Sequence, residues 1–210
     1  MPAEIKKLSH REAKKEECRK AIAQAAVQLF EEKGYEATTM DEIARAAHVS
    51  RPTVFNYFPR KEDILWALGT MLRQRLSEQA QVISQESAED PLAAIGRILV
   101  TVASGFAEYP ETSQAFHLYK MQDVHARRRA GETPDNEMGE QRQLILSLIE
   151  RGQAKRLIRS DFTALELMHH LMIGLFASTI GPWIHGEHSG EPLPNLVARH
   201  FNLYVQGIAP

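Results

Sequence analysis

The sequence has a single cysteine, little net charge and no long hydrophobic run near its start. Cys18 cannot form a disulfide within the chain, and it lies in a polar stretch without neighbouring metal ligands. The first fifteen residues are polar, and the most apolar later segment carries Glu166, His169 and His170, so neither a signal peptide nor a membrane-spanning helix is expected. We therefore predict a protein of the reducing cytoplasm with no membrane partner.

The sequence also lacks the common catalytic and cofactor motifs. It contains no nucleophile elbow with an ordered Ser, Asp and His, no phosphate-binding loop, no HExxH zinc motif and no dinucleotide glycine pattern. His169 and His170 are adjacent and so diverge on a helix, while His185 and His188 lack a clear third ligand. We expect neither an enzyme nor a bound cofactor or metal.

What is present is the composition of an ordinary soluble protein. The 210 residues are 43% hydrophobic and 25% charged, which suits one large domain or two small ones. The net charge of -2 hides an uneven distribution, because seven Lys or Arg stand against three Glu between Lys6 and Lys20. This basic leader within residues 1–20 is either a solvated helix face or an arm that contacts the DNA minor groove.

The spacing of apolar residues predicts an all-α protein. Apolar residues recur at intervals of three and four rather than two, and no repeat of fixed period interrupts them. Glycine and proline breaks divide the chain into about nine expected helices. The first ends at Lys33, and the others span about 39–48, 50–58, 61–84, 91–108, 112–129, 136–154, 162–183 and 193–207.

Residues 39–58 have the pattern of a helix-turn-helix. Thr39 and Glu42 form a capping-box pattern that opens a short helix. After a tight turn, Ser50 can cap a second short helix, and Pro52 sits in its first turn, where the missing N–H has no helical partner. Buried residues that would pack this pair against the first helix are Ile43, Val49, Val54 and Phe58.

The second short helix carries side chains suited to DNA. Arg51 suits a guanine edge and Asn56 an adenine edge, whereas Thr53 and Phe55 suit the thymine methyl. Tyr57 and Lys61 suit phosphates, and Thr39 stands at a helix N-terminus whose free amides attract phosphate oxygens. Simple packing of the short helix is the alternative explanation for Phe55 and Tyr57.

The run AIAQAAVQLFEEKGYEATTMDEIARAAHVSRPTVFNYFPRKEDIL resembles the DNA-binding domain of TetR/AcrR family transcriptional regulators. The resemblance implies phosphate contacts by Thr39, Tyr57 and Lys61, and base reading by the stretch from Arg51 to Asn56. Pro52 stands where many members have glycine. Arg60 stands where members of the family usually have a small polar residue that caps the helix starting at Lys61.

The resemblance also implies two domains, a DNA-binding domain at 1–60 and an effector-binding and dimerisation domain at 61–210. An effector pocket is expected in the middle helices, although methionines and aromatics at helical spacing also serve as core. The candidate pocket residues are Trp66, Phe106, Phe116, His117, Tyr119, Met121 and His125.

The last two expected helices have wide apolar stripes that predict a homodimer. Two copies of this pair would form a four-helix interface and present two recognition helices to a pseudo-palindromic operator. The alternative is that the stripes form the core of one chain. The candidate interface residues are Leu171, Leu175, Phe176, Ile180, Val197, Phe201 and Tyr204.

These features predict a sequence-specific DNA-binding regulator. We expect a repressor that a small, largely apolar ligand releases from double-stranded operator DNA. The alternative is a regulator of the same type without a small effector, controlled by a partner protein or acting as an activator.

Overall fold

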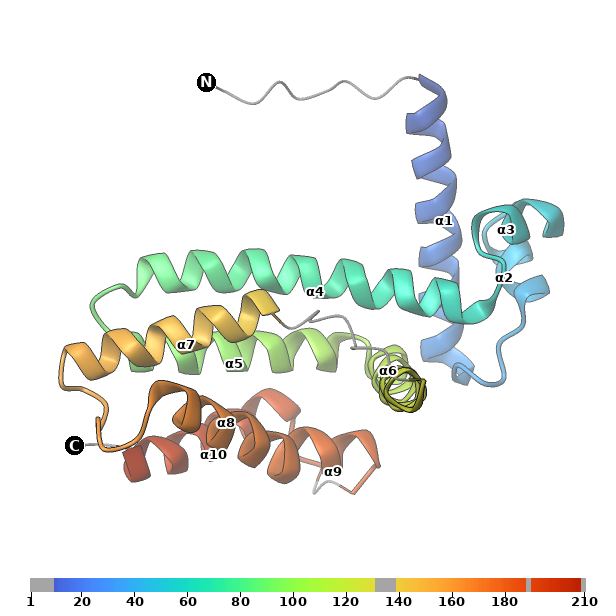
Figure 1. Ribbon diagram of the computed structural model, residues 1–210. Coiled ribbons are helices and arrows are strands. Elements are labelled where there is room, and N and C mark those ends of the chain that lie inside the picture. Colours follow the sequence, from blue (N-terminus) through green and yellow to red (C-terminus); the bar gives the residue numbers. More distant parts are fainter. Residues whose placement is uncertain (1–9, 131–138, 188–189, 209–210) are drawn as a thin grey trace. The chain divides into compact units, whose positions relative to one another are not determined.

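The computed structural model describes residues 10–130, 139–187 and 190–208, and this part of the chain is helical without a strand (Figure 1). The first half contains α1 (His10–Lys33), α2 (Met40–Ala46), α3 (Arg51–Tyr57), α4 (Lys61–Glu86) and α5 (Pro91–Glu108). The second contains α6 (Pro110–Arg129), α7 (Gly139–Ala154), α8 (Ala164–Leu175), the π-helical turn η1 (Phe176–Ile180), α9 (Gly181–Ile184) and α10 (Leu193–Ile208). The all-α prediction is confirmed, and α8, η1 and α9 form one of the nine expected helices. Lys6, Lys7 and His188 lie outside the described residues.

The chain divides into two compact units. The first unit contains Met1–Thr70 together with Glu111–Tyr119, and the second contains Met71–Pro110 together with Lys120–Pro210. Helices α4 and α6 therefore contribute to both units. The domain boundary expected at residues 60 and 61 stays a prediction, and the first turns of both α4 and α6 belong to the first unit.

The core of the first unit forms where α1, α2 and α3 meet the starts of α4 and α6. Phe30 of α1, Ile43 of α2 and Val54 of α3 are completely buried in it. Phe116 of α6 packs so closely on Gly69 of α4 that an added Cβ would lie 2.3 Å from its ring. This core holds the short helices α2 and α3, whose few residues would not be stable alone.

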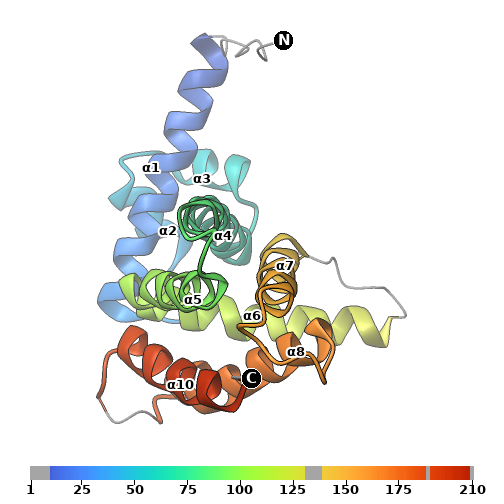
Figure 2. The same ribbon diagram turned by 90° about the vertical axis from the view of Figure 1, so that its left-hand side faces the viewer.

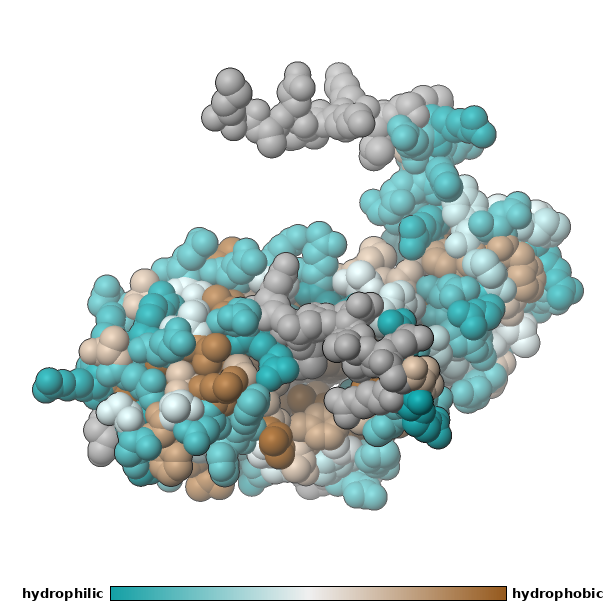
Figure 3. All heavy atoms as spheres, viewed as in Figure 1, coloured by the Kyte–Doolittle hydropathy of each residue, from teal (hydrophilic) through white to brown (hydrophobic). Residues whose placement is uncertain are grey.

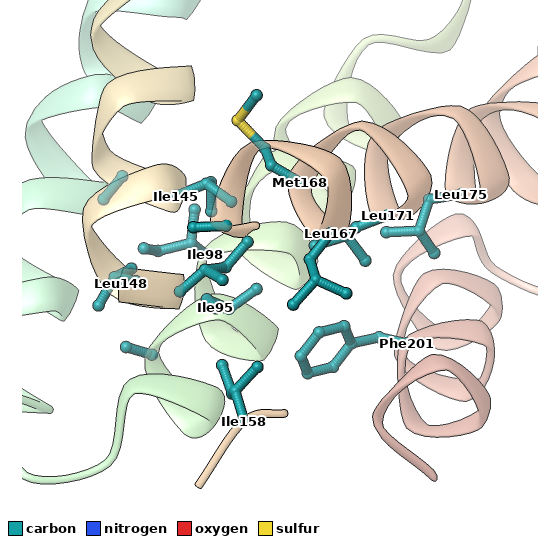
Figure 4. Packing of buried hydrophobic residues seen from close by; sticks show 14 of the residues in the cluster. Ile95, Ile98, Ile145, Leu148, Ile158, Leu167, Met168, Leu171, Leu175 and Phe201 are labelled. Carbon is teal, nitrogen blue, oxygen red and sulfur yellow. The ribbon is translucent and has the colours of Figure 1, made fainter. Parts of the chain in front are cut away.

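The core of the second unit lies within a ring of four helices. Helix α5 contacts α7 and α10, and α8 contacts the same two helices. Figure 2 shows these four helices around a common centre, and Figure 4 shows the side chains that fill it. The labelled residues there are Ile95, Ile98, Ile145, Leu148, Ile158, Leu167, Met168, Leu171, Leu175 and Phe201.

The helix expected at 162–183 begins two residues later and contains a π-helical turn. Its start is a capping box, in which Thr163 accepts a hydrogen bond from the Glu166 amide and Glu166 accepts one from the Thr163 amide. Farther along, Gly181 N–H donates to the Phe176 carbonyl, five residues back. Pro182 has no N–H and its ring would clash with the carbonyl four residues earlier, so the wider turn accommodates the proline within a continuous helix.

Two segments, Pro91–Glu108 and Ala164–Ile184, are long and apolar enough to cross a membrane by length and composition alone. Ile95 in the first and Leu171 in the second are buried in the core of the second unit. Core helices of soluble proteins pass the same test, so these segments are weak evidence for a membrane protein.

Candidate nucleic-acid interface

The start of α2 is held by a complete capping box. The Thr39 amide donates to Glu42 Oε2 at 2.9 Å, and the Glu42 amide donates to Thr39 Oγ1 at 3.3 Å. Glu42 also forms an ion pair with Lys33 of α1. The hydrogen bond from Lys33, followed by those from Thr39, lowers the pKa of Glu42 to about 2. This network fixes α2 against α1 and leaves Thr39 exposed, and the phosphate contact expected of Thr39 stays a prediction.

The turn between α2 and α3 contains a residue in the left-handed region. His48 has a φ of 54°, and the amide of Val49 donates to the carbonyl of Ala44 at 3.0 Å. Ser50 then caps α3 by accepting a hydrogen bond from the Thr53 amide, and Pro52 follows in the first turn. The cap and the proline agree with the sequence prediction, whereas the left-handed His48 was not predicted, because this conformation usually selects glycine or asparagine.

One face of α3 is exposed. Arg51, Pro52, Phe55 and Asn56 all lie on the exposed side, whereas Val54 is buried on the opposite side. Arg51 Nε lies 3.0 Å from Asp41 Oδ1, and its guanidinium lies 5.5 Å from the centroid of the Phe55 ring. We call Arg51, Pro52, Phe55 and Asn56 the reading face, because it offers a forked cation, an amide and an aromatic edge side by side.

Thr53 and Tyr57 lie off the reading face and are half-buried. The Thr53 and Ser50 hydroxyls are 2.7 Å apart, so the Thr53 hydroxyl takes part in the helix cap. Burial and a hydrogen bond with Cys18 of α1 raise the pKa of the Tyr57 hydroxyl. Tyr57 therefore stays protonated at neutral pH, at the junction of α3 with α1.

Lys61 is engaged inside the protein. Its Nζ donates to the carbonyl oxygens of Tyr35, Glu36 and Thr38 at 2.6, 3.2 and 3.0 Å, and it lies 4.2 Å from the Tyr35 ring centroid. These three acceptors match the three hydrogens of an ammonium group. Lys61 thus fastens the loop between α1 and α2, a role that the sequence did not predict, and its expected phosphate contact stays a prediction.

Arg60 precedes α4 at the position where a small polar residue would cap the helix. Instead, the Asp63 carboxylate accepts from the Arg60 amide at 2.9 Å and pairs with its guanidinium at 3.3 Å. Asp63 therefore makes the return half of a capping box, in which its carboxylate accepts from the Arg60 amide, while the Arg60 side chain has no acceptor oxygen to complete it.

A contact far apart in sequence joins α1 to the start of α6 within the first unit. Glu31 of α1 accepts hydrogen bonds from the backbone amides of Glu111 and Thr112, at 3.2 and 2.9 Å, and from the Thr112 hydroxyl at 2.6 Å. A carboxylate here satisfies amides that the first turn of a helix leaves free. No signal in the sequence identified this partner.

The candidate pocket residues fall into two groups. Trp66, Phe116 and Tyr119 pack together in the core of the first unit, where the Trp66 and Phe116 ring centroids are 5.9 Å apart. Phe106 packs in the second unit beside Ala103 and Trp183. His117 is half-buried, and Met121 and His125 are exposed, so the expected pocket stays a prediction.

Most of the expected interface residues contribute to the core of their own chain. Leu171, Leu175, Val197 and Phe201 are each no more than 8% exposed, and the Tyr204 hydroxyl donates to the Leu167 carbonyl at 2.5 Å. These residues pack within their own chain, and the expected interface stays a prediction. Phe176 is 39% exposed and Ile180 is half-buried.

Other large apolar side chains of the same helices point outward. Ile173 of α8 is 69% exposed and Leu203 of α10 is 67% exposed, and Leu165 of α8 is also exposed. We call Leu165, Ile173, Phe176 and Leu203 the outer apolar face. Hydrophobic residues are visible at the surface over α7 and α8 in Figure 3.

Comparison with known proteins identifies the family. Residues 22–68, which contain α2, α3 and the reading face, match the sequence profile described as bacterial regulatory proteins, tetR family. This segment is a TetR-family DNA-binding domain. The resemblance found in the sequence is thereby confirmed, and the family's relatives named below are transcriptional regulators rather than enzymes.

The sequence similarity to TetR-family relatives is concentrated in the N-terminal part. The chain is 33% identical over 95 residues to the regulator EthR of Mycolicibacterium smegmatis, covering 45% of this chain and 44% of that one. It is 31% identical over 121 residues to BetI of Rhizobium meliloti, covering 52% and 59%. The chain thus spans about half the length of the curated relatives it matches.

The structural similarity extends over nearly the whole chain. FadR of Thermus thermophilus, a TetR-family transcriptional repressor solved with lauroyl-CoA, matches with a TM-score of 0.63 at 26% identity. The match covers 91% of this chain and 95% of that one. The C-terminal helices therefore share the TetR-family fold where sequence similarity is low.

Proposed function

We propose that this TetR-family chain binds operator DNA in the cytoplasm as a homodimer and represses transcription until a small, largely apolar ligand releases it. The reading face of α3 carries this proposal. The face is exposed, it offers Arg51 and Asn56 side by side, and capped helices and a packed core hold it in place. These are the requirements for a helix that enters the major groove.

Arg51 and Asn56 are the proposed base-reading residues. Arg51 forms an exposed ion pair with Asp41, and such a pair is weak enough to exchange for a guanine edge. Asn56 can pair with adenine through its amide, and the Phe55 ring can contact a thymine methyl. Thr39 and Tyr57 flank the face and are proposed to contact phosphates.

Dimerisation is proposed through the outer apolar face together with Ile180. Large apolar side chains on adjacent helices lose contact with water when a second copy covers them. A two-fold axis through this face would supply the two reading faces that a pseudo-palindromic operator requires.

Selection of random duplex DNA with the purified protein tests DNA binding. We expect a palindromic sequence to be enriched, with Arg51→Ala or Asn56→Ala relaxing the preference at single positions by about 1–3 kcal/mol each. The control Arg199→Ala removes an exposed arginine from α10 and should leave the preference unchanged. Failure to enrich any sequence would refute the proposed DNA binding.

The effector is tested by adding apolar ligands to the complex at fixed salt concentration. Lauroyl-CoA is the first probe, because FadR was solved with this compound. Release from the enriched duplex supports a ligand-responsive repressor. Stable binding in the presence of lauroyl-CoA and of mixed apolar compounds would favour a regulator without a small effector.

A further inference from the structure

The first two turns of α1 extend beyond α2 and α3, as Figures 1 and 2 both show. Farther along α1, Ile22 and Ala26 form the side that faces the core. At 100° per residue, Arg11 and Lys15 of the first turns lie on this same side with Glu12, and Lys14 lies next to Arg11 at its edge. The basic residues of these turns are Arg11, Lys14 and Lys15. We call these three residues the basic face. Where the helix extends past the core, the apolar side of α1 therefore gives way to charged residues, most of them cations.

The basic face borders a hollow beside α3. Arg11, Glu12, Lys14, Lys15, Cys18 and Tyr57 line this open hollow, whose volume is about 630 Å³. Three cations and one carboxylate leave it positively charged. The Arg19 guanidinium, 5.4 Å from the centroid of the Phe58 ring, helps to hold α1 against the end of α3. Tyr57, next to the reading face, forms part of the wall of this hollow.

The opposite side of the same helical segment has a different charge. Glu16 and Glu17 lie there with Lys20, and all three are exposed. Arg11, Lys14 and Lys15 line the hollow with Tyr57, and Glu12 is its one carboxylate. The separation of charge indicates an anionic partner on the Tyr57 side.

We propose that the basic face binds backbone phosphates of the DNA that flanks the operator, without reading its sequence. The inference rests on the proposed function, because α3 must lie in the groove for the DNA to run past α1. Lysine and arginine contacts of this kind release condensed counterions, so they appear as added salt dependence rather than as base preference.

The test compares two lengths of the enriched duplex. One is trimmed to the enriched sequence, and the other is extended at each end by roughly five arbitrary base pairs, about half a helical turn. We expect the full-length protein to bind the extended duplex more tightly and with a steeper salt dependence. Each phosphate contact adds about 0.9 to the slope, which is roughly a threefold loss of affinity for a fourfold rise in salt.

Matched variants assign the added slope to the basic face. Lys14→Gln combined with Lys15→Gln should reduce the slope on the extended duplex toward that of the trimmed one, and should leave the trimmed duplex unaffected. The control Lys20→Gln combined with Arg73→Gln removes the same charge from exposed or half-exposed positions elsewhere and should change neither slope. Equal effects of both double variants would mean that net charge alone is responsible, which would overturn the proposal.

The single cysteine offers a readout that does not depend on affinity. Cys18 lines the hollow and is half-buried, so DNA bound there should slow its alkylation by N-ethylmaleimide. The extended duplex should protect Cys18 more than the trimmed duplex does. Equal alkylation rates with both duplexes would overturn the proposal even if both bind, whereas failure of both duplexes to bind would refute the proposed function itself.

Discussion

The two units of the chain differ in how completely they bury their apolar side chains. Of the large apolar residues exposed in the described part of the chain, Phe55 and Leu118 belong to the first unit and the other ten to the second. In the first unit, helix caps, an ion pair and a lysine bound to a loop hold the short helices in place. Few of its large apolar side chains stay exposed. The second unit buries a core of its own and still leaves large apolar groups exposed, as the proposed dimerisation through the outer apolar face requires.

The largest effect is expected from placing charges on the outer apolar face. Ile173→Glu combined with Leu203→Glu should weaken the homodimer by at least a hundredfold, about 3 kcal/mol, because buried unpaired carboxylates oppose association. Sedimentation equilibrium measures the dissociation constant. Gln81→Glu, an exposed change on α4, is the control and should leave it unaltered. If the double variant remains dimeric, the outer apolar face is not the dimer interface.

The next largest effect is expected from overpacking the core of the first unit. Gly69→Ala places a Cβ 2.3 Å from the Phe116 ring and should lower the free energy of unfolding by about 1–3 kcal/mol. Urea denaturation monitored by circular dichroism gives this value. Gly207→Ala adds a Cβ with no atom within 4 Å in the described structure and should change stability by less than about 0.5 kcal/mol. Equal losses for both variants would argue against the tight packing of Gly69.

Lys61→Met should destabilise the first unit by roughly 1–2 kcal/mol, because three carbonyl oxygens lose a charged donor. The salt dependence of DNA binding separates this role from a phosphate contact. If Lys61 only holds the loop, the melting temperature falls and the slope is unchanged. If the slope also falls by about 0.9, Lys61 contacts a phosphate as the sequence predicted.

The capping box of α2 should give a smaller and pH-dependent effect. Thr39→Ala should cost about 1 kcal/mol at neutral pH. Because the folded pKa of Glu42 is about 2 and its ordinary value is 4.5, the stabilisation by its charge is complete above pH 4.5 and is lost as the pH falls toward 2. Glu42→Gln should therefore lose stability at pH 7 and show a weaker decline between pH 4.5 and 2. If the stability of the variant declines as much as that of the natural protein over this pH range, other carboxylates cause the decline.

The smallest effect is expected at the turn between α2 and α3. His48→Gly should raise the free energy of unfolding by up to about 1 kcal/mol, because glycine adopts the left-handed conformation without steric cost. His48→Val should lower it, and thermal unfolding distinguishes the two. A loss of stability in the glycine variant would show that the His48 side chain contributes more than its backbone strain costs.

The sequence predicted the parts of the molecule that depend on local interactions. The helices, the capping box of Thr39 and Glu42, and the Ser50 cap were all predictable, because their partners lie within four residues. Lys61 and Glu31 were not, because their acceptors and donors are more than twenty residues away. The outward side of α10 was also missed, since periodicity shows that Phe201 and Leu203 lie on different sides but not which of them faces the core.

The membership of Glu111–Tyr119 in the first unit has a consequence for protein engineering. A fragment that ended at Thr70 would lack the Phe116 ring that covers Gly69, and it would leave the Glu31 carboxylate without the amides of α6. The DNA-reading part is therefore not a portable module that can be cut at one point and fused to another sensor. A functional chimera must carry the start of α6 along with the first seventy residues.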